Sequence, residues 1–256
     1  ASDVYKRQAQ GNIGEVMVNP YRIAPLTAVI RSGGYVVKNA SVRIVPKQNG
    51  QEIRYSVSDE NVRTAGGIPV FGLYPDWLNT VEVEYDRVFN GKTEHFSDRY
   101  QLYAAPVFLR SNGTPGQTHT TFNVKVLKMD PAFKDRLYFI NNLIPTPPDA
   151  SRVVWNNPMG GALEWAFGPE NAIVDSTGTV RWYLNPDVEM YDPDQPYKAG
   201  IMMGFEQTAD GGLLFGYGQR YAKYDMTGRE IFNRRLPMGY ACLLYTSPSP
   251  RDRSLS

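Results

Sequence analysis

The sequence predicts an all-β protein with an N-terminal β-sandwich over residues 9–128 and the first one to two blades of a truncated β-propeller over residues 151–241. Three observations support this fold class. Apolar and polar residues alternate with a period of two, Asn-Gly and Pro-Gly turns separate the alternating segments, and a turn-and-strand motif repeats in the C-terminal part. Helical periodicity is nearly absent from the chain.

The alternating segments are typical of strands that bury one face. Residues 80–85 read TVEVEY, and residues 52–57 read EIRYSV. In both segments every second side chain is apolar, as in the half-buried strands of antiparallel sheets. Asn49-Gly50 and Asn90-Gly91 stand between such segments, and Asn-Gly readily adopts the positive φ angles that tight hairpins require.

A repeated motif indicates the propeller. Asp175-Ser-Thr-Gly178 and Asp225-Met-Thr-Gly228 begin 50 residues apart, and an aromatic residue follows each glycine by four positions, Trp182 and Phe232. We expect these two aromatics to fill the same inward position of successive blades, since short strands repeating at this period are typical of propellers. Two unrelated hairpins that share a common turn would give the same pattern.

Two further expectations follow from this organisation. The Pro-rich string IPTPPD at residues 144–149 indicates that residues 129–150 form a linker or surface loop. A propeller buries its blades by closing a ring, so one or two blades would leave apolar faces open to water. We therefore expect the following side chains to be exposed: Ile201, Met203, Leu213, Leu214 and Phe215.

The two ends of the chain have a different character. Residues 1–8, ASDVYKRQ, and residues 242–256, which begin CLLYTSPSPRD, match translated sequencing adapters and are expected to be non-native. The 27 basic and 26 acidic residues of the chain include four basic and two acidic residues in these ends, which leaves 23 basic and 24 acidic residues. This balance gives no case for a nucleic-acid partner. The one cysteine, Cys242, also lies in these ends, so neither a thiolate metal site nor a disulfide is expected.

Candidate catalytic and metal-binding residues are few. His95 and His119 lie in polar surroundings of the expected sandwich, and neither is accompanied by a Cys or by an Asp, Glu and His set with the spacing of a metal site. Asp192 and Asp194 resemble the start of a calcium loop, but the glycine and the terminal glutamate of an EF-hand are missing. We expect no metal and no cofactor. No apolar run is long enough for a membrane helix, and no membrane insertion is expected.

Several long strings resemble one known family. The chain is similar to bacterial arylsulfate sulfotransferases of the type that uses no nucleotide sulfate donor, in these strings: VNPYRIAPLTAVI (18–30), GIPVFGLYPDWLNTVEVEY (67–85), FKDRLYFINN (133–142), MGGAL (159–163) and YDMTGREI (224–231). The resemblance implies a β-sandwich followed by a six-bladed propeller, export to the periplasm and a homodimer. It also implies transfer of a sulfuryl group from a phenolic sulfate ester to a phenol through a sulfohistidine intermediate.

The resemblance places no catalytic residue in this chain. The nucleophilic histidine of the family follows the string that reads LPMGY here, at residues 236–240, where the adapter-like end begins. Trp165 aligns with an aromatic residue that lines the family's substrate funnel, and Ile201 lies beside a second such position. We therefore expect an inactive fragment of a sulfotransferase. The alternatives are a non-enzymatic sandwich and propeller module for binding or structure, and a propeller enzyme with a quinone or metal cofactor.

Overall fold

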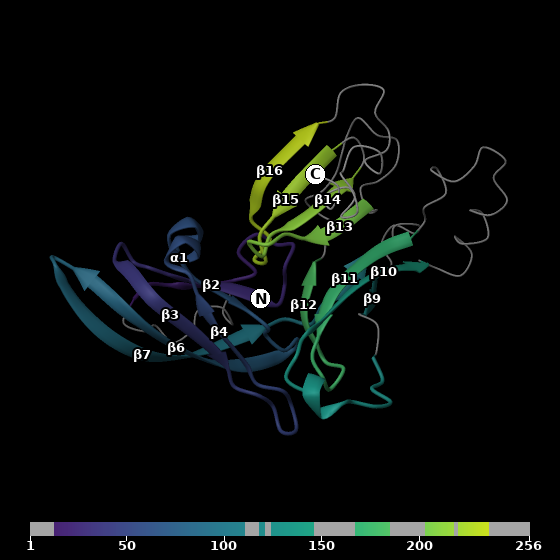
Figure 1. The fold of residues 1–256 in the computed structure, drawn as a ribbon, viewed down its shortest axis with the longest axis horizontal. Coiled ribbons are helices and arrows are strands. Elements are labelled where there is room, and N and C mark those ends of the chain that lie inside the picture. Colours follow the sequence, from purple (N-terminus) through teal and green to yellow (C-terminus); the bar gives the residue numbers. More distant parts are fainter. Residues whose placement is uncertain are drawn as a thin grey trace, which may run out of the picture.

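The computed structural model describes residues 13–110, 118–120, 124–145, 167–184, 203–217 and 220–235, whose regular secondary structure is almost entirely β (Figure 1). The expected all-β fold class is confirmed. The terminal segments 1–8 and 242–256 lie outside the described residues, as do Ile201, Asp192 and Asp194.

Two antiparallel sheets form the N-terminal sandwich. The first has the order β1-β2-β5, and the second has the order β4-β3-β6-β7. The strands are β1 (Val16–Val18), β2 (Thr27–Arg31), β3 (Val36–Ile44), β4 (Ile53–Val57), β5 (Gly67–Phe71), β6 (Trp77–Phe89) and β7 (Lys92–Ala104). Strands β6 and β7 run along the whole length of the sandwich (Figure 1). A short pair, β8 (Phe108–Arg110) with β9 (Thr118–Thr120), follows.

The alternating pattern selects the buried face of the sandwich as predicted. Val81, Val83 and Tyr85 have no exposed surface, whereas Glu82 and Glu84 point to the other face. Side chains from both sheets form one apolar cluster, because each sheet has only one apolar face to bury. At Asn90-Gly91 the register pairs Phe89 with Lys92, so the predicted two-residue turn is confirmed, with positive φ at both positions.

Helix α1 (Asp59–Ala65) connects β4 to β5 and was not predicted. The helix has seven residues, too few to show a helical period, but its ends carry clear signals. The Ser58 hydroxyl accepts a hydrogen bond from the Asn61 backbone N–H at 3.1 Å, and Gly66 ends the helix with φ of 67°.

Two further antiparallel sheets follow the sandwich, with orders β10-β11-β12 and β13-β14-β15-β16. Their strands are β10 (Tyr138–Pro145), β11 (Phe167–Val174), β12 (Val180–Leu184), β13 (Met203–Gln207), β14 (Leu213–Tyr217), β15 (Arg220–Tyr224) and β16 (Glu230–Arg235). The expectation of a linker or loop over residues 129–150 does not hold for residues 138–145. This segment is β10, and it pairs along its length with β11, up to and including Pro145. Its first residues, Tyr138, Phe139 and Ile140, are of the types that favour strands. A 3₁₀ turn (Pro131–Phe133) precedes it.

The two copies of the repeated motif form the same turn. Asp175 Oδ1 accepts hydrogen bonds from the Thr177 backbone N–H at 3.0 Å and from its hydroxyl at 2.6 Å. Asp225 does the same with Thr227 at 2.9 and 2.6 Å. The following aromatics occupy the same position in the two hairpins, as expected, since Trp182 pairs with Ile173 and Phe232 with Lys223 after the same register shift. They differ in burial, because Trp182 is fully buried, whereas Phe232 is only partly buried.

The apolar residues of β14 are covered, contrary to expectation. Leu213 and Phe215 have no exposed surface, and Leu214 is partly buried. The sheet β10-β11-β12 and Ile23 of the sandwich supply the covering atoms. Rings from both sheets stack against one another, with Phe139 and Phe205 centroids 5.3 Å apart and Phe205 and Phe215 centroids 5.5 Å apart. Neighbouring segments therefore bury these residues without a closed ring of blades.

The glycine of the first repeated turn lies against another segment, which gives a test of the fold. A Cβ at Gly178 would lie 2.6 Å from the Val124 carbonyl oxygen, and φ there is 85°. We predict that Gly178→Ala lowers the free energy of unfolding by about 2–4 kcal/mol, because left-handed strain and a backbone clash add together. The free energy is measured by urea denaturation.

Gly91→Ala is the matched control, because Gly91 also has positive φ, at 76°, but has open space around a Cβ. This control loses only the strain, about 1–2 kcal/mol. Equal losses in the two variants would contradict the close packing of the 175–178 turn.

Candidate functional site

The sandwich and the sheet β10-β11-β12 meet around one buried ion pair. Arg181 of β12 and Asp175 at the end of β11 both have fully buried side chains, and Arg181 Nη1 donates to Asp175 Oδ2 at 2.9 Å. Two main-chain carbonyls of the sandwich accept the other bonds, from Nη1 to Gln51 O at 2.9 Å and from Nε to Gly72 O at 3.0 Å. A buried charge is tolerated only when hydrogen bonds and an opposite charge replace its lost hydration.

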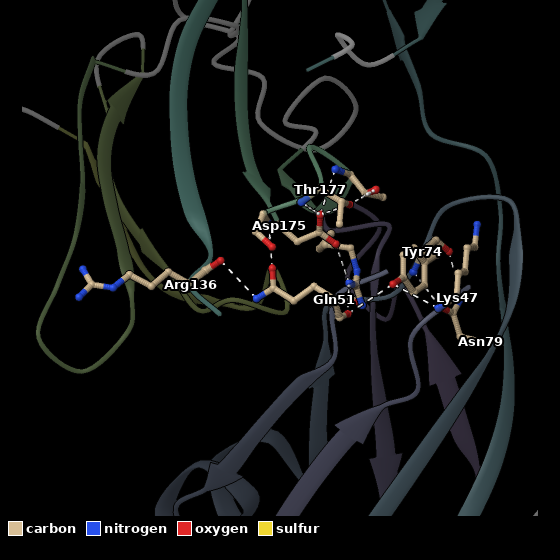
Figure 2. A network of polar contacts seen from close by, with 11 residues as sticks. Lys47, Gln51, Tyr74, Asn79, Arg136, Asp175 and Thr177 are labelled. Atoms are coloured by element: carbon tan, nitrogen blue, oxygen red, sulfur yellow. Dashed lines mark hydrogen bonds and ion pairs between the residues drawn. The ribbon is translucent and has the colours of Figure 1, made fainter. Parts of the chain in front are cut away.

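Gln51, in the loop between β3 and β4, contacts two segments of the second part of the chain. Its side-chain oxygen accepts a hydrogen bond from the Ser176 backbone N–H at 2.8 Å, and its amide nitrogen donates to Arg136 O at 3.3 Å. Figure 2 shows Gln51 between Arg136 and Asp175 on one side and Tyr74 on the other. One residue of the sandwich thus fixes both the β11–β12 turn and the segment before β10.

An aromatic ring covers the guanidinium from the sandwich side. The Arg181 guanidinium carbon lies 3.7 Å from the centre of the Tyr74 ring, within the range of a cation–π contact. Asn79 holds the main chain of Tyr74 in place, since its side chain accepts from Tyr74 N at 2.8 Å and donates to Tyr74 O at 3.0 Å (Figure 2). Burial raises the pKa of the Tyr74 hydroxyl above its usual value of 10.0.

Lys47 adds a second cation at the edge of this cluster. Its Nζ lies 4.2 Å from the centre of the Trp77 ring and 4.8 Å from that of Tyr74. Burial, and then the positive charge of Arg181, lower the pKa of the Lys47 ammonium below 10.5. The cluster of Lys47, Gln51, Tyr74, Asp175 and Arg181 holds no histidine, serine or cysteine that could act as a nucleophile. Its chemistry suits the fixing of one segment against another.

A crevice of about 510 Å³ lies between the sandwich and the sheet β13-β14-β15-β16. One wall consists of α1 and the stacked rings of Tyr55 and Phe71, whose centroids are 4.2 Å apart. The other wall carries Asp210 and the Asp225–Arg229 pair, in which Arg229 Nε and Asp225 Oδ2 are 2.9 Å apart. The charged groups of this second wall are already paired with neighbours, Asp210 with Lys223 at 2.6 Å.

The residues singled out from sequence are placed only in part. Trp165 and Ile201, the two expected substrate contacts, lie outside the described residues. His95 on β7 is largely exposed and bonds Asp86 through Nδ1 at 2.9 Å. Hydrogen bonds from Asn39 first, and then from His95, hold the pKa of the Asp86 carboxyl below its usual range. His119 lies on β9, and its side chain is outside the description.

The described part of the chain has neither a candidate metal site nor a membrane-spanning helix. No group of three or more His, Cys, Asp or Glu side chains in that part of the chain is arranged to hold a metal ion. No helix there is long and apolar enough to cross a membrane.

Sequence reasoning missed the Asp175–Arg181 pair, although a signal for it exists. The segment at 180–184 reads VRWYL, in which Arg181 is one charged residue in an otherwise apolar strand. A charge in such a position predicts a buried partner, and Asp175 stands six residues earlier in the repeated motif. The main-chain acceptors at Gln51 and Gly72 carry no comparable signal.

The Asp210–Lys223 pair predicts a pH dependence. Hydrogen bonds from Lys223 first, and then from Thr208, hold the pKa of the Asp210 carboxyl below its usual value of 3.8. A carboxyl whose folded pKa is lowered stabilises the fold above the unfolded pKa, and this contribution is lost as the pH falls. We predict that Lys223→Met loses less stability than the unmutated chain between about pH 5 and pH 2, as measured by urea denaturation at each pH.

Lys38→Met serves as the control, since Lys38 is an exposed lysine on β3. The Asp210 side chain is 63% exposed, so the difference should be small and should shrink in high salt. A difference of the same size in the control would contradict the assignment to this pair.

Comparison with known proteins identifies the family. Residues 15–105 match the family model for the arylsulfotransferase Ig-like domain, and residues 123–245 match the model for arylsulfotransferase (ASST). The chain is 32% identical to "Arylsulfate sulfotransferase AssT" of Lelliottia amnigena over 249 residues and to the protein of that name from Escherichia coli O6:H1 (strain CFT073) over 247 residues. These alignments cover 91% and 90% of this chain but only 40% of each relative. The chain belongs to the arylsulfotransferase family, and its sandwich is the family's Ig-like domain.

Proposed function

We propose that this chain is part of an arylsulfate sulfotransferase, which transfers a sulfuryl group from a phenolic sulfate ester to a phenol. The observation that carries this proposal is the match of both family models, in order, over residues 15–105 and 123–245. The two relatives, named as arylsulfate sulfotransferases, support the same activity. The chain spans about two fifths of their length, so the activity concerns a longer protein than the residues present here.

We further propose that the sheets after the Ig-like domain are the first blades of a propeller. The sheet β13-β14-β15-β16 has four antiparallel strands in sequential order, which is the topology of a propeller blade. The sheet β10-β11-β12 packs beside it through the stacked rings of Phe139 and Phe205. On this proposal the domains are the sandwich up to about residue 128 and the start of the propeller up to residue 241.

The proposed chemistry is nucleophilic catalysis by a histidine in the part of the relatives that this chain does not span. An imidazole nitrogen attacks the sulfur, an N–S bond forms, the S–O bond to the aryl group breaks, and the phenolate leaves and takes up a proton. The oxygen of a second phenol then attacks the sulfur and loses its proton, and the N–S bond breaks. Two moderate steps replace one difficult step, which is the advantage of a covalent intermediate.

The residues of this chain contribute scaffold in this scheme. Trp165 is proposed to line the funnel that holds the phenyl ring, with Ile201 beside it, because an apolar wall suits an aromatic substrate. His95 is not proposed as the nucleophile, since it is exposed on a strand of the Ig-like domain and bonded to Asp86. A periplasmic location and a homodimer are part of the proposal, as the resemblance to bacterial sulfotransferases implies.

The test uses the reading frame that contains this sequence, recovered in full and expressed beside the 256-residue chain. We predict transfer from phenyl sulfate to a phenol acceptor by the full-length protein and none by the 256-residue chain. Replacing the downstream nucleophilic histidine by alanine should lower the rate by more than about a thousandfold.

His95→Ala in the full-length protein is the control, and its rate should not change. Sulfuryl transfer by the 256-residue chain, or loss of activity in His95→Ala, would overturn the assignment of the chemistry to the downstream part. A full reading frame without such histidines would favour the alternative, a non-enzymatic binding or structural module.

A further inference from the structure

Strand β12 contacts the Ig-like domain with one face and the next sheet with the other. Consecutive residues of a strand point to opposite faces, and here both faces are covered, since Arg181 and Trp182 have no exposed surface. Arg181 donates to Gln51 O and Gly72 O of the Ig-like domain. Trp182 Nε1 donates at 2.7 Å to Met226 O, in the turn between β15 and β16.

The packing of β12 follows the same division. Tyr183, on the side of Arg181, belongs to the apolar cluster of the Ig-like domain. Leu184, on the side of Trp182, belongs to the cluster that contains Leu213 and Phe215. The apolar core of the Ig-like domain thus continues into the sheet β10-β11-β12 at this strand.

The polar contacts of Arg181 join residues 15–105 and residues 123–245, the two parts of the chain that match the family models. Its acceptors Gly72 and Gln51 lie 109 and 130 residues earlier in the chain. The position of Gly72 requires a glycine, because φ is 93° and a Cβ there would lie 2.8 Å from Ile53 Cδ1. Both acceptors are main-chain carbonyls in fixed positions, so the guanidinium, with its rigid set of donors, determines the fit.

The second copy of the motif lacks this bridge. Arg229 pairs with Asp225 of its own turn at 2.9 Å, and its side chain is 30% exposed. Arg181 follows its aspartate by six residues and reaches the Ig-like domain, whereas Arg229 follows its aspartate by four. The two arginines therefore differ in burial and in spacing, and Arg181 alone of the two bonds the Ig-like domain in the described structure.

We infer that the contacts of Arg181 join the Ig-like domain and the sheet β10-β11-β12 into one cooperative unit. The Asp175–Arg181 pair stays buried only while the Ig-like domain supplies two acceptors and the Tyr74 ring. If the Ig-like domain moves away from β12, Arg181 loses both carbonyl acceptors and the Tyr74 ring. The buried pair is then destabilised, so separation of the two parts is coupled to opening of the sheet β10-β11-β12. Trp182 extends the unit to the sheet β13-β14-β15-β16.

The experiment is native-state hydrogen exchange followed by mass spectrometry on the whole chain, with increasing denaturant. In the unmutated chain, peptides of β10–β12 and peptides of β3, β6 and β7 should lose protection together, as parts of one cooperative unit do. The test variant is Asp175→Asn with Arg181→Met. It removes both charges, and the asparagine oxygen still accepts the hydrogen bonds of Thr177 and Thr179 within the turn.

In this double variant the β10–β12 peptides should exchange about tenfold faster or more, while β3, β6 and β7 keep their protection. Asp225→Asn with Arg229→Met is the matched control, and it should change only the β15–β16 hairpin. The proposal is refuted if the two sets of peptides still lose protection together in the test variant, or if the control variant separates their protection equally.

Arg181→Lys gives a second measurement, should the double variant fail to fold. Lysine keeps the charge for Asp175 but cannot also reproduce the Nε–H bond to Gly72 O and the planar contact with Tyr74. Faster exchange in β10–β12 than in β3, β6 and β7 is again the expected result. Unchanged coupling in this variant would also refute the proposal.

Discussion

A guanidinium without exposed surface loses its hydration, and contacts from two separate parts of the chain replace most of it at Arg181, while Arg181 Nη2 has no hydrogen-bond partner among the described residues. Asp175 supplies the opposite charge from the neighbouring strand, at 2.9 Å. Gln51 and Gly72 supply carbonyl oxygens, and Tyr74 supplies the face of a ring. Because a buried charge that loses its partners is strongly destabilising, the position of the Ig-like domain and the position of β12 depend on each other. The contacts of Gln51 with Ser176 and Arg136 lie around this pair, and they too join the Ig-like domain to the segments on either side of the sheet β10-β11.

Apolar packing extends the same arrangement in both directions. On one side the core of the Ig-like domain continues to Tyr183, and on the other side Trp182 and Leu184 join the core beneath β14. Ile23 of the Ig-like domain reaches this second core as well. The first two sheets after the Ig-like domain therefore bury apolar surface against it and against each other. This explains why Leu213 and Phe215 are covered here, although a propeller normally covers such residues with further blades.

The strands of the Ig-like domain could be predicted from sequence because the alternation of apolar and polar residues in each strand shows which face is buried. Val81, Val83 and Tyr85 alternate with Glu82 and Glu84, and Asn90-Gly91 specifies a two-residue turn, so local chemistry determined both. Helix α1 and strand β10 were missed for different reasons. The helix is too short to show a period, and the prolines that follow β10 obscured the strand-forming residues before them. Of the junction, only Arg181 had a visible signal, a charge within an apolar strand.

The sequence by itself determined the all-β class, the strand faces, the Asn90-Gly91 turn and the resemblance to the arylsulfotransferase family, whereas Asn49-Gly50 lies in a longer loop between Ile44 and Ile53. These properties depend on the order of neighbouring residues, or on long strings that can be compared directly. Only the tertiary structure decided that Asp175 and Arg181 form a fully buried pair, that its acceptors are the carbonyls of Gln51 and Gly72, and that β14 is covered. The physical reason is that main-chain carbonyls are chemically alike at every residue. Which of them meets a given guanidinium depends on how segments more than a hundred residues apart pack together, and neither periodicity nor composition records that.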